Sequence, residues 1–153
     1  MNQLEKSNRR VEVSALISDV VYTFETNYTA NLPDPLANAR KELEDAGINN
    51  VEIVDHMYDK DSGVAAIAVE DTMTGETYIS YAGTNMDADG HKDPIVDLAI
   101  ALNDTLYLKE KNKPALDFYD RVEASGHYIS TTTGHSYGEF QAGRTAMERQ
   151  VPS

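Results

Sequence analysis

The sequence contains no cysteine, and basic residues are scarce in it. Without cysteine the chain cannot form a disulfide framework, a thiolate zinc site or a cysteine-based redox centre. Only 13 lysines and arginines stand against 26 aspartates and glutamates, which gives a formal net charge of -13. This negative excess repels phosphate backbones and anionic lipid surfaces, so nucleic acid is not an expected partner.

Long hydrophobic runs are also missing. No apolar run approaches the roughly 20 residues of a membrane span, and the N-terminus, MNQLEKSNRR, is polar. The sequence therefore predicts neither a transmembrane helix nor a signal peptide, and it favours a cytoplasmic location while leaving non-classical export open. The 153 residues, 41% of them hydrophobic, match one ordinary domain with a buried core. We expect a single domain over residues 1–153, with residues 1–47 as its helical N-terminal segment.

Hydrophobic periodicity predicts two helices in that segment. Apolar residues recur at three- and four-residue spacing over residues 11–26, which is the pattern of an amphipathic helix. For a second helix over residues 35–46, Asp34 is the expected N-cap, Pro35 takes the first helical position and Gly47 ends it.

The rest of the chain alternates between strand-like and helix-like runs. Three β-rich runs occupy residues 51–59, 63–71 and 76–83. The turns between them, KDSG and TMTG, are short enough for hairpins. Two helical patterns, each opening at a proline, occupy residues 94–108 and 114–125. A last β-branched run over residues 127–133 leads into a turn, and the fold class predicted by this order is α/β.

That turn reads GHSYG at residues 134–138 and matches the G-x-S-x-G pattern of a nucleophile elbow. An elbow holds a serine in a sharp turn between a strand and a helix, so its neighbours must be small, as Gly134 and Gly138 are. The following helix points free N–H groups at the place where an oxyanion develops. Ser136 is therefore the candidate nucleophile, and the backbone amide of Tyr137 is a candidate oxyanion donor. The alternative is a glycine-rich turn without chemistry.

A second segment, TYISYAGTNMDADGHKDPIVDL, together with GHSYG resembles the class 3 lipases of the α/β-hydrolase fold. In that family a strand ends in an aromatic-x-Gly-Thr or aromatic-x-Gly-Ser turn, here YAGT, and an Asp-x-x-x-Asp pattern follows, here DPIVD. The resemblance covers residues 48–148 and implies a three-layer α/β sheet with flanking helices, in which Thr84 donates the second oxyanion-hole amide. Two positions depart from the family: Pro94 replaces an aromatic residue, and Glu139 replaces a small one.

The resemblance implies hydrolysis of a lipid or other carboxylic or phospholipid ester through an acyl-serine, without metal or other cofactor. In this fold an acid and then a histidine follow the serine, whereas Glu139 and Glu148 but no histidine follow Ser136. We therefore expect a hydrolase domain truncated after the elbow helix, incomplete at its C-terminus and inactive alone, with a complementing C-terminal segment as a partner. The alternative is a catalytically dead binding or interaction module with an apolar groove near Tyr81 and Tyr137.

A third hypothesis is a complete enzyme with an unusual base. His127 opens the strand that leads to Ser136, so an extended chain would separate the two by about 25 Å, and His91 is left as the candidate. His56 falls on a predicted strand and is expected to be structural. The loop around His91 carries aspartates spaced partly like a calcium loop, but it lacks the glutamate that such a loop needs, so no metal site is expected.

Overall fold

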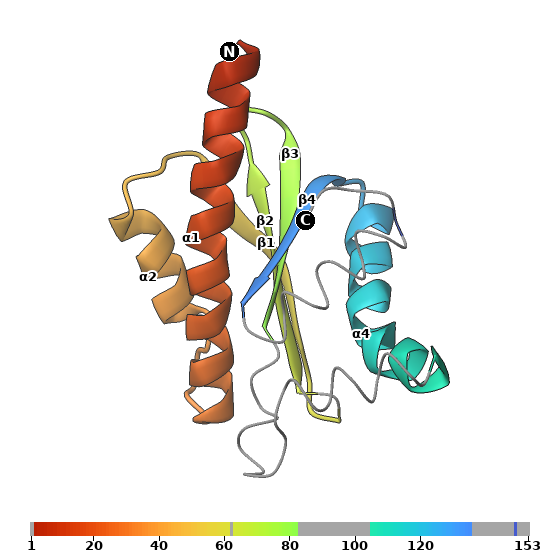
Figure 1. Ribbon diagram of the computed structural model, residues 1–153. Coiled ribbons are helices and arrows are strands. Elements are labelled where there is room, and N and C mark those ends of the chain that lie inside the picture. The colour runs from red at the N-terminus through yellow and green to blue at the C-terminus, as the bar shows by residue number, and fades with distance from the viewer. Residues whose placement is uncertain (1, 62, 83–104, 136–148, 150–153) are drawn as a thin grey trace.

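The computed structural model describes residues 2–61, 63–82, 105–135 and 149 (Figure 1). In chain order the elements within these ranges are α1 (Gln3–Thr29), α2 (Ala37–Asp45), β1 (Val51–Asp59), β2 (Val64–Asp71), β3 (Glu76–Ala82), α4 (Thr105–Ala124) and β4 (Tyr128–His135). The predicted α/β class is confirmed. No helix in these ranges is both long and apolar enough to cross a membrane.

Helix α1 begins at Gln3, two turns before the predicted start. The side-chain oxygen of Asn2 accepts a hydrogen bond from the backbone N–H of Glu5 at 2.8 Å, and the Glu5 carboxylate accepts one from the N–H of Asn2 at 3.4 Å. Such a capping box stabilises a helix start by about 1 kcal/mol. The predicted start was wrong because the first turns of α1 are mostly polar, and apolar periodicity cannot detect them.

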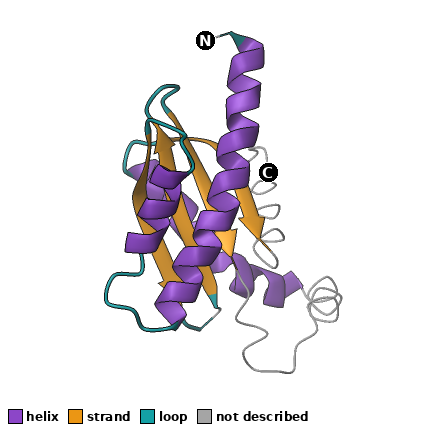
Figure 2. Ribbon diagram, turned by 90° about the vertical axis from the view of Figure 1, so that its left-hand side faces the viewer, coloured by secondary structure: helices purple, strands orange, loops and turns teal. Residues whose placement is uncertain are grey.

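The described sheet has the order β1-β2-β3-β4 (Figure 2). Strands β1, β2 and β3 form two antiparallel hairpins, as the short turns predicted. Each hairpin turn ends in a glycine with positive φ, at +74° for Gly63 and +75° for Gly75, a conformation that glycine adopts without strain. Strand β4 adds in parallel to β3, with α4 between them in the chain. The sheet is therefore mixed.

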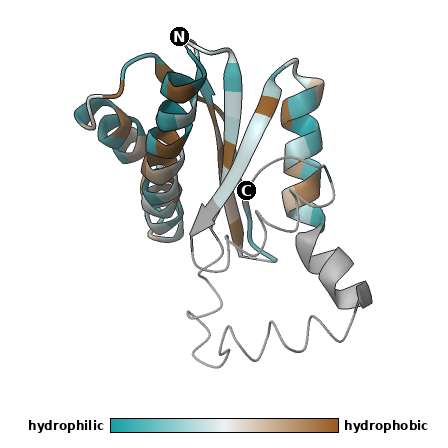
Figure 3. Ribbon diagram, turned by 45° about the horizontal axis from the view of Figure 1, so that its top comes forward, coloured by the Kyte–Doolittle hydropathy of each residue, from teal (hydrophilic) through white to brown (hydrophobic). Residues whose placement is uncertain are grey.

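Helices cover both faces of the sheet. Helices α1 and α2 lie on one side of the strands and α4 on the other (Figures 1 and 3). Strand β2 contributes to both cores, because its alternate side chains point to opposite faces. The core facing α1 takes Ala65, Ile67 and Val69, and the core facing α4 takes Val64, Ala66 and Ala68. Full burial on both faces explains why β2 is an unbroken apolar run rather than an alternating one.

Two helix starts differ from the prediction. Helix α2 begins at Ala37 with Leu36 as its N-cap residue, while Asp34 accepts a hydrogen bond from the N–H of Leu36 at 3.1 Å in the turn before it. Helix α4 runs continuously from Thr105 and holds Pro114 in its interior, so the expectation that a helix opens at Pro114 was wrong. Proline suits a first helical turn, and inside a helix it removes one backbone hydrogen bond, so the local pattern favoured a start at Pro114. The pattern at residues 94–108 lies mostly outside the described ranges.

Candidate functional site

The carboxyl ends of β3 and β4 lie side by side. The two strands are parallel, and Tyr81 pairs with Gly134 and Ala82 with His135. Strand β1 ends at the same edge, because Tyr58 pairs with Ala65, which pairs in turn with Ala82. In α/β proteins the edge where the carboxyl ends of parallel strands meet is where ligands bind. We therefore take this edge as the candidate site.

The residues predicted to carry the chemistry follow these strand ends in the sequence. Ser136 and Tyr137 come directly after β4, and Thr84 comes shortly after β3, but all three lie outside the described residues, as does His91. Of the GHSYG motif, the structure describes the first two residues, Gly134 and His135. Strand β4 continues through Gly134 to His135, whereas the sequence predicted that the strand ends at residue 133. Pairing with β3 holds these two residues in the sheet.

Side-chain contacts anchor both strand ends to the flanking helices. On the α1 side, the hydroxyls of Ser18 and Thr133 are 2.8 Å apart, which ties the middle of α1 to the end of β4. On the α4 side, the Tyr81 hydroxyl donates to the carbonyl oxygen of Ala115 at 2.9 Å. Tyr81 is fully buried. It therefore belongs to the core. The apolar groove predicted near Tyr81 and Tyr137 stays a prediction, because Tyr137 lies outside the described residues.

His56 and His127 have structural surroundings. The His56 ring packs edge-on against Phe24 at a centroid distance of 5.6 Å. Nδ1 of His127 lies 3.0 Å from a carboxylate oxygen of Glu70. His127 directly precedes β4, at the opposite end of the strand from His135. This position, at the amino end of β4, agrees with the prediction that His127 is not the base.

Two grooves in the described part lie at the amino ends of β1 and β4. One of about 450 Å³ runs between α2 and the start of β1, beside Leu43, Ile48 and Val51. Another of about 610 Å³ lies between α4 and the start of β4, beside Tyr119 and His127. Neither coincides with the candidate site. Within the described ranges, no group of three or more histidines, aspartates and glutamates could hold a metal ion.

Among the residues that the structure describes, three carboxylates are buried, and they lie at the two ends of the sheet. Asp71 and Glu76 lie at the amino end of β3, where Arg9 holds the first and Arg10 the second. Glu25, on α1, is only 3% exposed and lies toward the other end. Glu25 is not among the predicted site residues, although a glutamate among the apolar positions of an amphipathic helix is a usable signal.

Glu25 shares its surroundings with tyrosines. The rings of Tyr28 and Tyr58 stack with their centroids 4.5 Å apart. Burial raises the pKa of Tyr58, and the negative charge of Glu25 raises it further. Because electrostatic interactions weaken with distance, Glu25 is close to Tyr58, which stands in the row of paired residues that ends at His135.

No protein-family model and no curated protein matches the sequence. Among solved structures, the chain is similar to lipase II from Rhizopus niveus, with 13% sequence identity and a TM-score of 0.45. The match covers 93% of this chain and 56% of the other, so the chain spans little more than half the length of that lipase. A likeness of this degree assigns the chain to no family and leaves its chemistry to be argued from its own residues.

Proposed function

We propose that the chain is part of a serine hydrolase of the lipase or esterase type, with a three-layer α/β-hydrolase sheet. Ser136 is the nucleophile, and the backbone amides of Thr84 and Tyr137 form the oxyanion hole. The substrate is a carboxylic or phospholipid ester, and the reaction passes through an acyl-serine without metal or cofactor. The proposal includes a cytoplasmic location and a complementing segment that supplies a histidine and its acid.

One observation carries the proposal: β3 and β4 are parallel neighbours that end together, with Ala82 paired to His135. The two sequence motifs, YAGT and GHSYG, begin at these strand ends. An oxyanion hole of this type needs amides from two turns at one point, about 3 Å from the oxygen that they stabilise. Turns that leave adjacent parallel strands at the same edge start close enough together for this, whereas turns at opposite edges do not, so the pairing supports the proposal.

The nucleophile can be tested with an alkyl fluorophosphonate, which phosphonylates activated serines. We expect mass spectrometry of the labelled protein to locate the adduct on Ser136, and Ser136→Ala to abolish it. Ser125→Ala removes an exposed serine at the end of α4 and is the matched control, so it should be labelled like the wild type. An adduct on another residue, or undiminished labelling of Ser136→Ala, would refute the nucleophile.

The rate of ester hydrolysis tests the serine-hydrolase proposal against the alternative of a catalytically dead binding module. Removing the histidine of a Ser-His-Asp triad lowers turnover by a factor on the order of 10⁶. We therefore expect slow labelling of the isolated chain and almost no steady-state hydrolysis of a short p-nitrophenyl ester. Hydrolysis at the rates of intact esterases would show that the chain already holds an efficient base. Absence of both labelling and turnover, with imidazole present as an external base, would favour the binding module.

A further inference from the structure

Strand β1 is the outermost strand of the described sheet, and its pairing with β2 shows which backbone groups face outward. Asn50 stands opposite Thr72, and its carbonyl oxygen accepts a hydrogen bond from the Thr72 N–H at 2.8 Å. Residues that bond to the partner alternate along an antiparallel strand, so the N–H and C=O of Val51 and Ile53 point away from β2. Within the described ranges, no second strand pairs with these groups. They form a short template for another strand.

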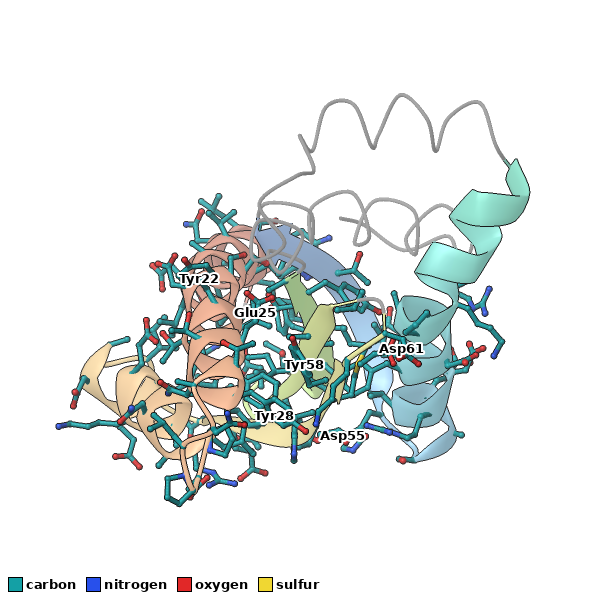
Figure 4. All side chains as sticks on the ribbon, turned by 90° about the horizontal axis from the view of Figure 1, so that it is seen from below. Tyr22, Glu25, Tyr28, Asp55, Tyr58 and Asp61 are labelled. Atoms are coloured by element: carbon teal, nitrogen blue, oxygen red, sulfur yellow. The ribbon has the colours of Figure 1, made fainter. Side chains whose placement is uncertain are left out.

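Two features end this open edge after residue 53. The register of β1 shifts between Ile53 and Asp55, so Val54 is the extra residue of a β-bulge, which interrupts regular pairing. Directly after the bulge, Arg121 of α4 donates to the carbonyl oxygen of His56 and to the Asp55 carboxylate, both at 2.9 Å. Asp55 lies between β1 and α4 (Figure 4). An added strand therefore has access to residues 51–53 and not to the following stretch.

The open edge forms one wall of the groove of about 450 Å³, and α2 supplies the other wall. Leu43 and Ile48 line this groove together with Val51 and Ile53, which pack against the core on the α1 and α2 side. Side chains that stand opposite each other in paired strands lie on the same face of the sheet. An occupant that fits both edge and groove is therefore an extended chain with apolar side chains opposite Val51 and Ile53.

The residue between them adds a requirement for charge. Glu52 stands directly opposite Glu70 of β2, and like charges at opposite positions destabilise a strand pair. Nδ1 of His127 lies 3.0 Å from the Glu70 carboxylate, whereas Glu52 is exposed and forms no ion pair within the described ranges. A lysine or arginine opposite Glu52 on an added strand would offset this repulsion. A second copy of the chain would not, because each copy carries a formal charge of -13.

We propose that the edge of β1 at residues 51–53 binds an extended basic peptide of a partner protein. The peptide adds to β1 as an antiparallel strand, with apolar side chains in the groove beside α2 and a cationic side chain opposite Glu52. Hydrogen bonds to the backbone supply affinity in this mode of recognition, and alternate side chains supply specificity. The groove lies away from the candidate site, so this inference does not depend on the proposed function.

The probe is the fluorophore-labelled peptide acetyl-Lys-Val-Lys-Val-Lys-amide, with binding followed by fluorescence polarisation. Its valines pair with Val51 and Ile53, and its central lysine pairs with Glu52. N-methylation of both valines removes the two N–H groups that face β1, so we expect binding to weaken by about 10-fold or more. N-methylation of the central lysine alters an N–H that points away from β1 and is the matched control, so this peptide should bind like the unmodified probe.

A protein variant tests the charge. Glu52→Lys should weaken binding of the probe by about 5-fold and strengthen binding of acetyl-Glu-Val-Glu-Val-Glu-amide. Glu12→Lys makes the same change of net charge at an exposed position of α1 and should leave both affinities near those of the wild type.

Three results would overturn the proposal. The first is no binding of the unmodified probe at millimolar concentration. The second is equal binding of the two N-methylated peptides, which would mean that β1 does not pair with the probe. The third is equal weakening by Glu52→Lys and Glu12→Lys, which would mean that only the net charge attracts it. The N-methyl series uses the unaltered protein, so it decides the pairing even if Glu52→Lys does not fold.

Discussion

At the scale of single residues, two neighbouring arginines fasten α1 to the β2–β3 hairpin. Arg9 Nη2 donates to the Asp71 carboxylate at 3.1 Å. Arg10 Nε donates to Glu76 at 3.0 Å, and Glu76 also accepts hydrogen bonds from Tyr78 and Ser130 at 3.3 Å. Such charge-assisted contacts are stronger than neutral ones. Removing one partner leaves a buried charge uncompensated, and that loss costs more than the pair itself contributes.

Glu76 should make the stability of the protein depend on pH. The Arg10 guanidinium holds the pKa of Glu76 below its usual range. A carboxyl whose pKa is lower in the folded state stabilises the protein above its unfolded pKa of about 4.3, and this contribution is lost as the pH falls through the folded pKa. We expect the free energy of unfolding to fall less between about pH 6 and pH 3 in Glu76→Gln than in the wild type.

Chemical denaturation at several pH values measures this difference. At neutral pH Glu76→Gln should lose about 2 kcal/mol, less than a fully buried pair would, because the Arg10 side chain is 45% exposed. Glu52→Gln, on an exposed position of β1, is the matched control and should follow the wild-type curve. Equal pH dependence of Glu76→Gln and the wild type would show that the pair does not form in solution.

At the scale of elements, Pro114 marks the difference between the helix predicted from the sequence and the helix α4 in the structure. The sequence pattern places Pro114 at the first position of a helix, where its missing N–H has no cost. The structure places it ten residues into a helix that begins at Thr105. There proline removes a hydrogen bond and its ring crowds the preceding turn, which costs about 3 kcal/mol relative to alanine.

Pro114→Ala should therefore stabilise the protein, by about 1–3 kcal/mol, in denaturant titrations followed by circular dichroism. Pro33→Ala is the matched control, since Pro33 lies in the loop before α2, where alanine loosens the unfolded chain and should cost about 0.4–1 kcal/mol. The two substitutions should thus change the free energy of unfolding in opposite directions. If Pro114→Ala also destabilises the protein, α4 begins at the proline.

At the scale of the whole molecule, net charge and hydrophobic packing oppose each other. Residues of α1, α2 and α4 bury the sheet from both faces, which supplies the main favourable term. A formal charge of -13 over 153 residues makes the folded chain repel itself. Salt screens charges that are more than about 8 Å apart at physiological ionic strength, but it screens buried pairs such as Arg9 and Asp71 much less.

Added salt should therefore raise the thermal midpoint at neutral pH. We expect scanning calorimetry to show a rise of several degrees between low and moderate sodium chloride, because screening relieves the repulsion and leaves the buried pairs largely intact. The control is the same salt series near pH 4.5, the isoelectric point from the sequence, where net repulsion vanishes. A midpoint that falls with salt at neutral pH would mean that attractive pairs outweigh the net charge.

The sequence by itself determined the local structure wherever a short-range signal was strong. The three strands of the hairpins follow from β-branched runs between glycine turns, and the strand before GHSYG follows from its threonines. Amphipathic periodicity identified the buried stripe of α1 but not its start, because the cap at Asn2 leaves no apolar pattern. Likewise, the position of Pro114 predicted the wrong start for α4, because the local helix preference of a residue contains no information about long-range packing.

Only the tertiary structure decided which distant segments meet. The parallel pairing of Ala82 with His135, which brings the two motif-bearing strand ends together, joins residues 53 positions apart in the sequence. The burial of Glu25 likewise brings together α1 and Tyr58 of β1, which follows Glu25 by 33 positions in the sequence. Local patterns determine elements because propensity and turn chemistry act over a few residues, whereas a site needs contacts that form only when the whole chain packs.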